Sequence, residues 1–130
     1  MSNLPQDFSY SEDHEWVNAA KGAVEGKTVR IGITSLAADR LGEVVFAELP
    51  EVGNTVTAGD SCGEVESTKS VSDLFSPVTG TVTAVNDAVH DDYAVINNDP
   101  FGEGWLFEVE VDEAGELMEA DDYASANGLD

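Results

Sequence analysis

Residues 63–74 have the sequence Gly-Glu-Val-Glu-Ser-Thr-Lys-Ser-Val-Ser-Asp-Leu. Two runs of valine and polar residues meet at a short polar centre, which predicts a β-hairpin with Lys69 near its tip. The chain has only three lysines. An ordinary solvated turn lysine is one interpretation of Lys69. The other is covalent modification, because its amine is a nucleophile on a flexible stem that a tight turn holds clear of the surface.

Covalent modification of Lys69 would change both the charge and the reach of the hairpin tip. An amide removes the positive charge of the lysine. A prosthetic acid attached there would form a mobile arm on the order of 14 Å long, from summed bond lengths.

Composition indicates a folded but very acidic domain. The 130 residues are 42% hydrophobic, enough for one domain with a real core, and carry 27 acidic and 5 basic side chains for a net charge of −22. Nucleic acid and anionic membranes are therefore poor partners. Because the charges are spread along the chain, we interpret them as adaptation to a high-salt cytoplasm, where the screening length falls to roughly 3 Å. Steering of a basic partner enzyme is the alternative.

The expected compartment is the cytoplasm. A single cysteine, Cys62, excludes an internal disulfide and is compatible with a reducing environment. Residues 1–10 show neither a signal-peptide nor a transit-peptide pattern, and no apolar run approaches a membrane span. Residues 1–9 are polar, contain Pro5, and are predicted to be a loosely held, flexible arm before a single domain over residues 10–130.

The periodicity of the chain predicts a mostly β fold. Val-rich alternating runs separated by glycine turns flank the hairpin, so we expect two small antiparallel sheets packed face to face with approximate two-fold symmetry. A short helix is expected after the second strand, with Thr34 or Ser35 as N-cap and Gly42 as its stop.

Four further segments have predicted structures. Residues 43–49 are expected to form a strand with Val44, Phe46 and Glu48 on one side. Residues 87–99 are expected to be an irregular polar loop, and residues 105–111 a strand that buries Trp105, Phe107, Val109 and Val111. A C-terminal helix is expected to follow, with Asp112 as its cap and Leu117, Met118 and Tyr123 docking it.

Several segments, which follow one another in the order usual for the family, resemble the glycine cleavage system H proteins. Residues 66–70 (Glu-Ser-Thr-Lys-Ser), with Ser-Asp-Leu at 72–74 and Ser-Pro-Val-Thr-Gly at 76–80, resemble the lipoylation site of that family. Further matches are His-Glu-Trp-Val at 14–17, Ile-Gly-Ile-Thr at 31–34, Leu-Gly-Glu-Val-Val-Phe at 41–46, Leu-Pro-Glu-Val-Gly at 49–53 and Asn-Asp-Pro-Phe-Gly-Glu-Gly-Trp at 98–105. They span nearly the whole chain, from about Tyr10 to Tyr123.

The resemblance implies a carrier with a lipoyl/biotinyl-like barrel-sandwich hybrid fold. Lipoate attached to Lys69 would shuttle an aminomethyl group from glycine decarboxylase to aminomethyltransferase and electrons to dihydrolipoyl dehydrogenase. A lipoylating enzyme is the fourth implied partner. The chain itself would be non-catalytic, and we expect it to be a monomer.

Four more site residues follow from matching positions in the family. Glu15 and Asp73 would lie in the cleft that holds the cargo amine, with ordinary solvated carboxylates as the alternative. Glu66 and Gly80 would be recognised by the lipoylating enzyme. The alternative for Gly80 is a turn that requires a positive φ angle.

Other functions find less support in the sequence. Independent catalysis has few candidate residues, since nothing supports pairing Cys62 with His14 or His90. The spacing of residues 90–92 does not fit a calcium loop, so no metal site is expected.

Other carriers with a modified lysine fit less well. A biotin carrier would place methionine on both sides of the lysine, which this chain does not. Lipoyl domains of 2-oxoacid dehydrogenases carry aspartate before it. A related role, relay of lipoyl or octanoyl groups to other acceptors, would keep the same modified lysine.

Overall fold

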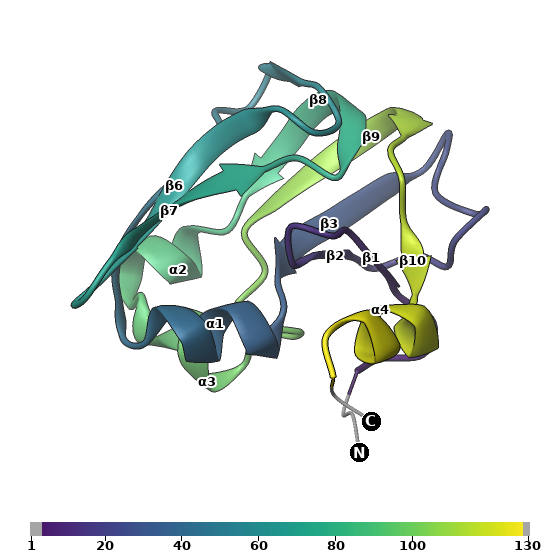
Figure 1. Ribbon diagram of the computed structural model, residues 1–130. Coiled ribbons are helices and arrows are strands. Elements are labelled where there is room, and N and C mark those ends of the chain that lie inside the picture. Colours follow the sequence, from purple (N-terminus) through teal and green to yellow (C-terminus); the bar gives the residue numbers. More distant parts are fainter. Residues whose placement is uncertain (1–3, 129–130) are drawn as a thin grey trace.

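The computed structural model describes residues 4–128, which form two antiparallel sheets and four short helices (Figure 1). The larger sheet has the strand order β10-β1-β2-β3-β9-β8-β5, and the smaller one β4-β6-β7. The strands are β1 (Ser9–Tyr10), β2 (Glu15–Val17), β3 (Thr28–Ile33), β4 (Val44–Glu48), β5 (Thr55–Val56), β6 (Ser61–Ser67), β7 (Val71–Phe75), β8 (Val78–Val85), β9 (Phe107–Ala114) and β10 (Met118–Glu119). The helices are α1 (Ser35–Leu41), α2 (Asp87–Asp91), α3 (Ala94–Asn98) and α4 (Ala120–Ala126).

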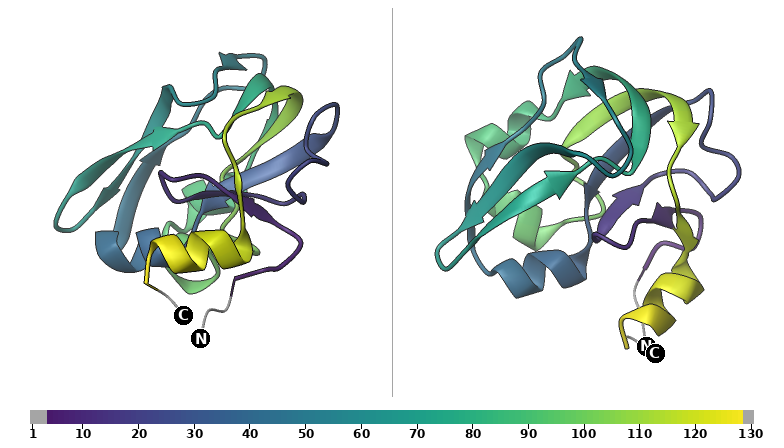
Figure 2. Two further views of the ribbon diagram at one scale, coloured as in Figure 1. Left: turned by 45° about the vertical axis from the view of Figure 1, so that its right-hand side comes forward. Right: turned by 45° about the horizontal axis from the view of Figure 1, so that its top comes forward.

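The mostly β architecture with two antiparallel sheets and short helices is confirmed. The sheets are unequal, however, because one of them gathers seven strands. Strand β1 pairs with both β2 and β10, which adds segments from the two ends of the described chain to the same sheet. The views in Figure 2 show the smaller sheet as a separate layer over the larger one.

The main core fills the space between these layers. Strands β3, β8 and β9 are adjacent in the large sheet and alternate buried apolar residues with exposed ones. Phe107, Val109 and Val111 are buried as predicted. Trp105 is not, because β9 begins at Phe107 and the Trp105 ring lies half-buried beneath the guanidinium of Arg30, 4.5 Å from the ring centre.

The segment before β1 is packed, in contrast to the loose arm expected from the sequence. Leu4 is buried, and the Phe8 ring lies 5.1 Å from that of Trp16. The Tyr10 hydroxyl donates to the carbonyl of Pro5 at 2.7 Å. These side chains belong to a second apolar cluster under α4, so burial of apolar surface holds residues 4–9 in place. Residues 1–3 of the expected arm lie outside the described residues.

Helix α1 forms where the capping residues predict it. The Thr34 hydroxyl accepts from the backbone N–H of Ala37 at 3.3 Å, which identifies Thr34 and not Ser35 as the N-cap. Gly42 ends the helix with a φ of 84°, a conformation that favours glycine.

Strand β4 departs from the predicted alternation. Val44 and Ala47 are buried, whereas Val45 and Phe46 are both exposed, Phe46 by 46%. A register shift in the pairing with β6 falls between Val44 and Phe46. An irregularity of this kind puts two consecutive side chains on the outer side, which a strict period of two cannot predict.

Two predictions for the second half of the chain are wrong, one of a loop and one of a helix cap. Residues 87–99 contain α2 and α3 in place of an irregular loop, with the Asn86 side chain accepting from Ala88 N–H as the cap of α2. Asp112 caps no helix, because pairing with β8 extends β9 to Ala114. The last helix begins at Ala120 with Glu119 in the N-cap position.

Candidate functional site

The predicted hairpin is present, and a serine-based turn presents Lys69 at its tip. The Ser67 hydroxyl accepts from the backbone N–H groups of Lys69 at 3.2 Å and Ser70 at 3.1 Å. The Ser67 N–H donates to the Ser70 carbonyl at 2.8 Å, and Thr68 N–H donates to the Glu43 carbonyl at 3.0 Å. The turn is therefore tied both internally and to the chain before β4, while the Lys69 side chain is exposed.

The stem of Lys69 lies against the end of helix α1. A Cβ atom at Gly42 would come within 3.0 Å of Lys69 Cε and 3.6 Å of its Nζ. The sequence predicts Gly42 only as a helix stop. The structure adds a contact with the lysine stem, which a side chain at position 42 would displace.

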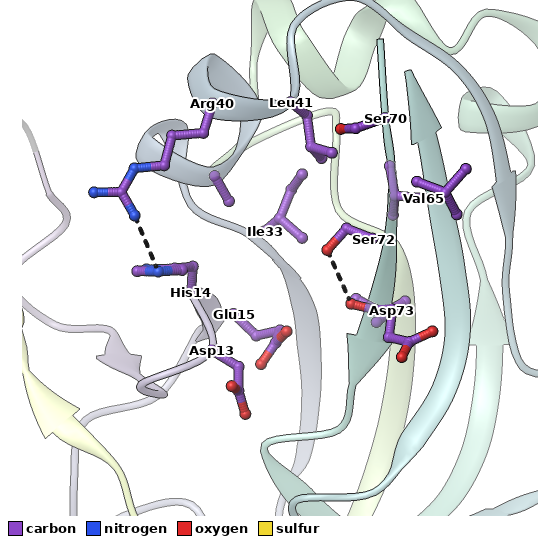
Figure 3. A pocket seen from close by; sticks show the side chains of 13 residues that line it. Asp13, His14, Glu15, Ile33, Arg40, Leu41, Val65, Ser70, Ser72 and Asp73 are labelled. Carbon is purple, nitrogen blue, oxygen red and sulfur yellow. Dashed lines mark hydrogen bonds between the residues drawn. The ribbon is translucent and has the colours of Figure 1, made fainter. Parts of the chain in front are cut away.

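A cleft of about 330 Å³ opens beside the hairpin (Figure 3). Its walls come from the loop before β2, from α1 and from the β6–β7 hairpin. The lining combines an apolar set, Ile33, Ala37, Leu41, Val65, Val71 and Leu74, with a polar set, Asp13, His14, Glu15, Arg40, Ser70, Ser72 and Asp73. Sites for small organic groups commonly have this composition, apolar with a few polar groups.

Glu15 lines this cleft as a buried carboxyl group. Only 2% of the residue is exposed, and Ser11 Oγ donates to Oε1 at 2.7 Å. Burial raises the pKa of Glu15 to about 8, because the low-dielectric surroundings disfavour the charged form. The solvated-carboxylate interpretation is therefore wrong for Glu15.

Asp73 also lines the cleft, but its carboxylate points away from Glu15 (Figure 3). It is exposed on β7, directly opposite Glu64 of β6, which is in turn opposite Glu48 of β4. Three carboxylates thus cross the outer face of the small sheet in one row. Like charges directly opposite one another destabilise a sheet.

The structure separates Glu66 from Gly80. Glu66 is exposed on β6, three residues before Lys69, between Phe46 and Val71 of the neighbouring strands. Gly80 is buried in β8, in the other sheet. It has no positive φ, so the turn interpretation is wrong. Glycine is needed there because a Cβ would collide with the Glu110 carbonyl and lie 2.8 Å from Val109 Cγ1.

A polar network at the rim of the cleft was not predicted. His14 Nδ1 lies 2.7 Å from the Tyr123 hydroxyl, which also lies 2.8 Å from Thr34 Oγ1. His14 Nε2 lies 3.5 Å from Arg40 Nη1. Burial and then the nearby Arg40 lower the pKa of His14. Since His14 and Tyr123 are 109 positions apart, no local spacing could have indicated their contact.

The two sheets and the lysine at a hairpin tip define a carrier domain of the lipoyl and biotinyl type. The Glycine cleavage H-protein family model matches residues 8–127. The chain therefore belongs to the glycine cleavage H-protein family.

Individual relatives agree with this assignment. The chain is 82% identical over 130 residues to the glycine cleavage system H protein of Corynebacterium aurimucosum, covering 100% of both chains. It is 63% identical over 127 residues to that of Corynebacterium jeikeium, covering 98% of this chain and 99% of the relative. The crystal structure of a glycine cleavage system H protein from Mycobacterium marinum superposes with a TM-score of 0.94 at 54% identity, covering 97% of this chain and 100% of the other.

The family assignment confirms the predicted function as the lipoyl carrier of the glycine cleavage system, and the crystal structure confirms the fold class. The family implies a lipoate cofactor and partners within that system. No helix in residues 4–128 combines the length and apolar character that a bilayer crossing requires.

Proposed function

We propose that Lys69 carries the lipoyl group as an amide and that the chain acts as a non-catalytic carrier. Its three partner enzymes would be glycine decarboxylase, aminomethyltransferase and dihydrolipoyl dehydrogenase, with a lipoylating enzyme adding the group. The observation that supports this most directly is the exposed Lys69 on a tied turn beside a cleft that contains a buried carboxyl group. We expect the carrier to act as a monomer in the cytoplasm.

The chemistry of the cleft fits such a group. The apolar lining from Ile33, Leu41 and Val65 suits an aliphatic chain, and an arm of roughly 14 Å from Lys69 reaches across a cleft of this size. When bound, the lipoyl disulfide supplies the redox and group-accepting chemistry.

The residues of the chain would protect and orient the cargo amine. With the arm folded into the cleft, its apolar walls would keep water from the adduct, which would slow hydrolysis. Glu15 would hold the amine, since a cation close to its carboxyl group favours the carboxylate and forms a charge-assisted hydrogen bond. Asp73 would act at the cleft mouth, because its carboxylate is exposed and points away from Glu15.

The lipoylating enzyme would read the exposed hairpin surface. Glu66 is accessible and close to Lys69 in the chain, so it is the better candidate for direct contact. Gly80 would contribute through the packing of the large sheet, since it is buried.

Mass measurement tests the attachment. Intact protein and the peptide containing Lys69, purified from native cells, should show the increment of one lipoyl amide, absent in Lys69→Arg. Lys27→Arg serves as the matched control and should keep the increment. A biotinyl increment would move the chain to carboxylase chemistry, and an unmodified Lys69 would contradict the proposal.

A further inference from the structure

Tyr123 is the residue through which helix α4 reaches the rim of the cleft. Its ring is fully buried and stacks on Tyr10, with ring centres 5.1 Å apart. Its hydroxyl lies close to two residues that are distant in the sequence, 2.7 Å from His14 Nδ1 and 2.8 Å from Thr34 Oγ1. His14 lines the cleft, and Thr34 caps α1, which forms one wall. Tyr123 therefore connects two sides of the cleft.

Arg40 determines the direction of the hydrogen bonds in this network. A guanidinium group donates and never accepts, so Arg40 Nη1, at 3.5 Å, faces an unprotonated His14 Nε2. The proton of the neutral imidazole is then on Nδ1, which donates to the Tyr123 oxygen. The Tyr123 O–H in turn donates to Thr34 Oγ1. This direction, from Arg40 through His14 and Tyr123 to Thr34, agrees with a guanidinium that can only donate, and Thr34 Oγ1 then accepts from both Tyr123 and the Ala37 N–H.

The backbone of His14 shows that its surroundings hold it firmly. His14 has a φ of 71°, the only positive φ of a non-glycine residue in the described part of the chain. Such a conformation persists where several contacts impose it. Its N–H donates to the Ser11 carbonyl at 3.2 Å, and its carbonyl accepts from Thr34 N–H at 2.9 Å. The bond to Tyr123 adds a constraint on the ring itself.

The position of Arg40 matters because Glu15 lines the same cleft. After burial, which lowers the pKa of His14, the charges of Arg40 and Asp13 shift that pKa in opposite directions. In Figure 3 the Arg40 side chain reaches toward His14 on the side of the cleft away from β7, while Glu15 lies below. A guanidinium released from His14 could approach Glu15 and occupy the carboxyl group that a cationic cargo would need.

We propose that Tyr123 is a positioning residue that fixes the His14 ring so that Nε2 keeps Arg40 away from Glu15. The Glu15 carboxyl group then stays available for a cationic amine. The role of the amine rests on the proposed function, whereas the positioning of His14 and Arg40 does not.

Nuclear magnetic resonance of the unmodified protein tests the positioning directly. The ¹⁵N shifts of the His14 imidazole should show a single Nδ1–H tautomer in the wild type. Tyr123→Phe should give a mixture of tautomers, and the ¹³C-detected pKa of Glu15 should fall by about one unit or more as Arg40 approaches. Tyr10→Phe is the matched control, since Tyr10 is an equally buried tyrosine of the same stack whose hydroxyl donates to the Pro5 carbonyl and, within residues 4–128, forms no hydrogen bond to His14 or Thr34. It should leave both signals unchanged.

Arg40 provides an independent variant because its side chain is exposed and its loss should not unfold the chain. Arg40→Gln should also give mixed His14 tautomers, and in the double variant with Tyr123→Phe the fall in the Glu15 pKa should be absent. A single tautomer in Arg40→Gln would overturn the proposal, even if Tyr123→Phe fails to fold. The proposal would also be overturned if folded Tyr123→Phe kept the wild-type tautomer of His14 and an unchanged Glu15 pKa.

The loaded carrier provides the functional measurement. Lipoylated Tyr123→Phe, loaded with glycine and glycine decarboxylase, should lose its one-carbon unit to water several-fold faster than wild type and Tyr10→Phe. An equal rate would overturn the link to the cargo. If the wild type itself cannot be loaded, the proposed function fails, while the resonance data still decide the positioning.

Discussion

Ser11 and Glu15 form a buried hydrogen-bonded pair, with the serine hydroxyl donating to the carboxyl group at 2.7 Å. Neither side chain is substantially exposed, and burial raises the pKa of Glu15 to about 8. The pair therefore places a group that titrates near neutral pH inside the cleft.

Stability should depend on pH through Glu15. Glu15 has an ordinary pKa of 4.5 in the unfolded chain and a pKa of about 8 in the folded chain. At pH values between these two, the folded chain keeps the proton on Glu15 and the unfolded chain loses it. The folded state then binds more protons than the unfolded state. The contribution of Glu15 to the stability of the fold is therefore complete below pH 4.5 and is lost as the pH rises through 8. Glu15→Gln should remove it. At pH 9 the variant should be more stable than wild type by at least about 1.4 kcal/mol, the equivalent of one pKa unit.

Urea unfolding at pH 5 and pH 9 measures this difference. Glu12→Gln is a suitable control because Glu12 is exposed nearby. Equal pH dependence in Glu15→Gln and wild type would contradict the raised pKa.

Gly42→Ala should impair modification of Lys69 as well as stability. The new Cβ would lie 3.0 Å from Lys69 Cε. Gly53 offers a matched control, since its φ of 93° is also positive but nothing lies within 4 Å of its Cβ position. Both variants should lose about 1 kcal/mol of stability. Only Gly42→Ala should slow lipoylation in vitro, and equal rates for the two variants would contradict a role for Gly42 beside the lysine.

Gly80→Ala should distinguish packing from recognition. Because the Cβ would collide with the Glu110 carbonyl in a buried sheet, we expect a loss of roughly 1–3 kcal/mol or more from overpacking. The fraction that remains folded should be lipoylated at a rate near that of wild type. If the variant were as stable as wild type but poorly lipoylated, direct recognition of Gly80 would be the better explanation.

The fold should weaken at low salt. A net charge of −22 repels itself, and the row of Glu48, Glu64 and Asp73 concentrates that repulsion on the small sheet. Circular dichroism should show weaker secondary structure when salt is dialysed away. Glu64→Gln, which removes the central charge of the row, should reduce this salt dependence relative to Glu116→Gln. Full retention of structure in salt-free buffer would count against the salt adaptation.

Local patterns in the sequence predict the features that depend on neighbouring residues. The hairpin around Lys69, the capped helix α1 and the alternating strand β9 all follow from spacing over twelve residues or fewer. The bulge in β4 and the short helices α2 and α3 do not, because tertiary packing decides them. The helix propensity of a five-residue segment is too weak to decide its structure against tertiary packing.

The site could be predicted only in part for a similar reason. The hairpin pattern and the resemblance to the family both indicate Lys69, and the resemblance indicates Glu15, but the burial of Glu15 depends on residues from several elements around it. The contact between His14 and Tyr123 joins positions that only the folded large sheet brings together.

The pairing of β1 with β10 also has a consequence for the order of events during translation. Residues 61–75, which form the hairpin, leave the ribosome well before residues 118–126, which supply β10 and Tyr123. A nascent chain can therefore display Lys69 while the rim of its cleft is still incomplete. Lipoylation that requires only the hairpin could begin on the ribosome, whereas protection of cargo would have to wait until α4 has been synthesised and docked.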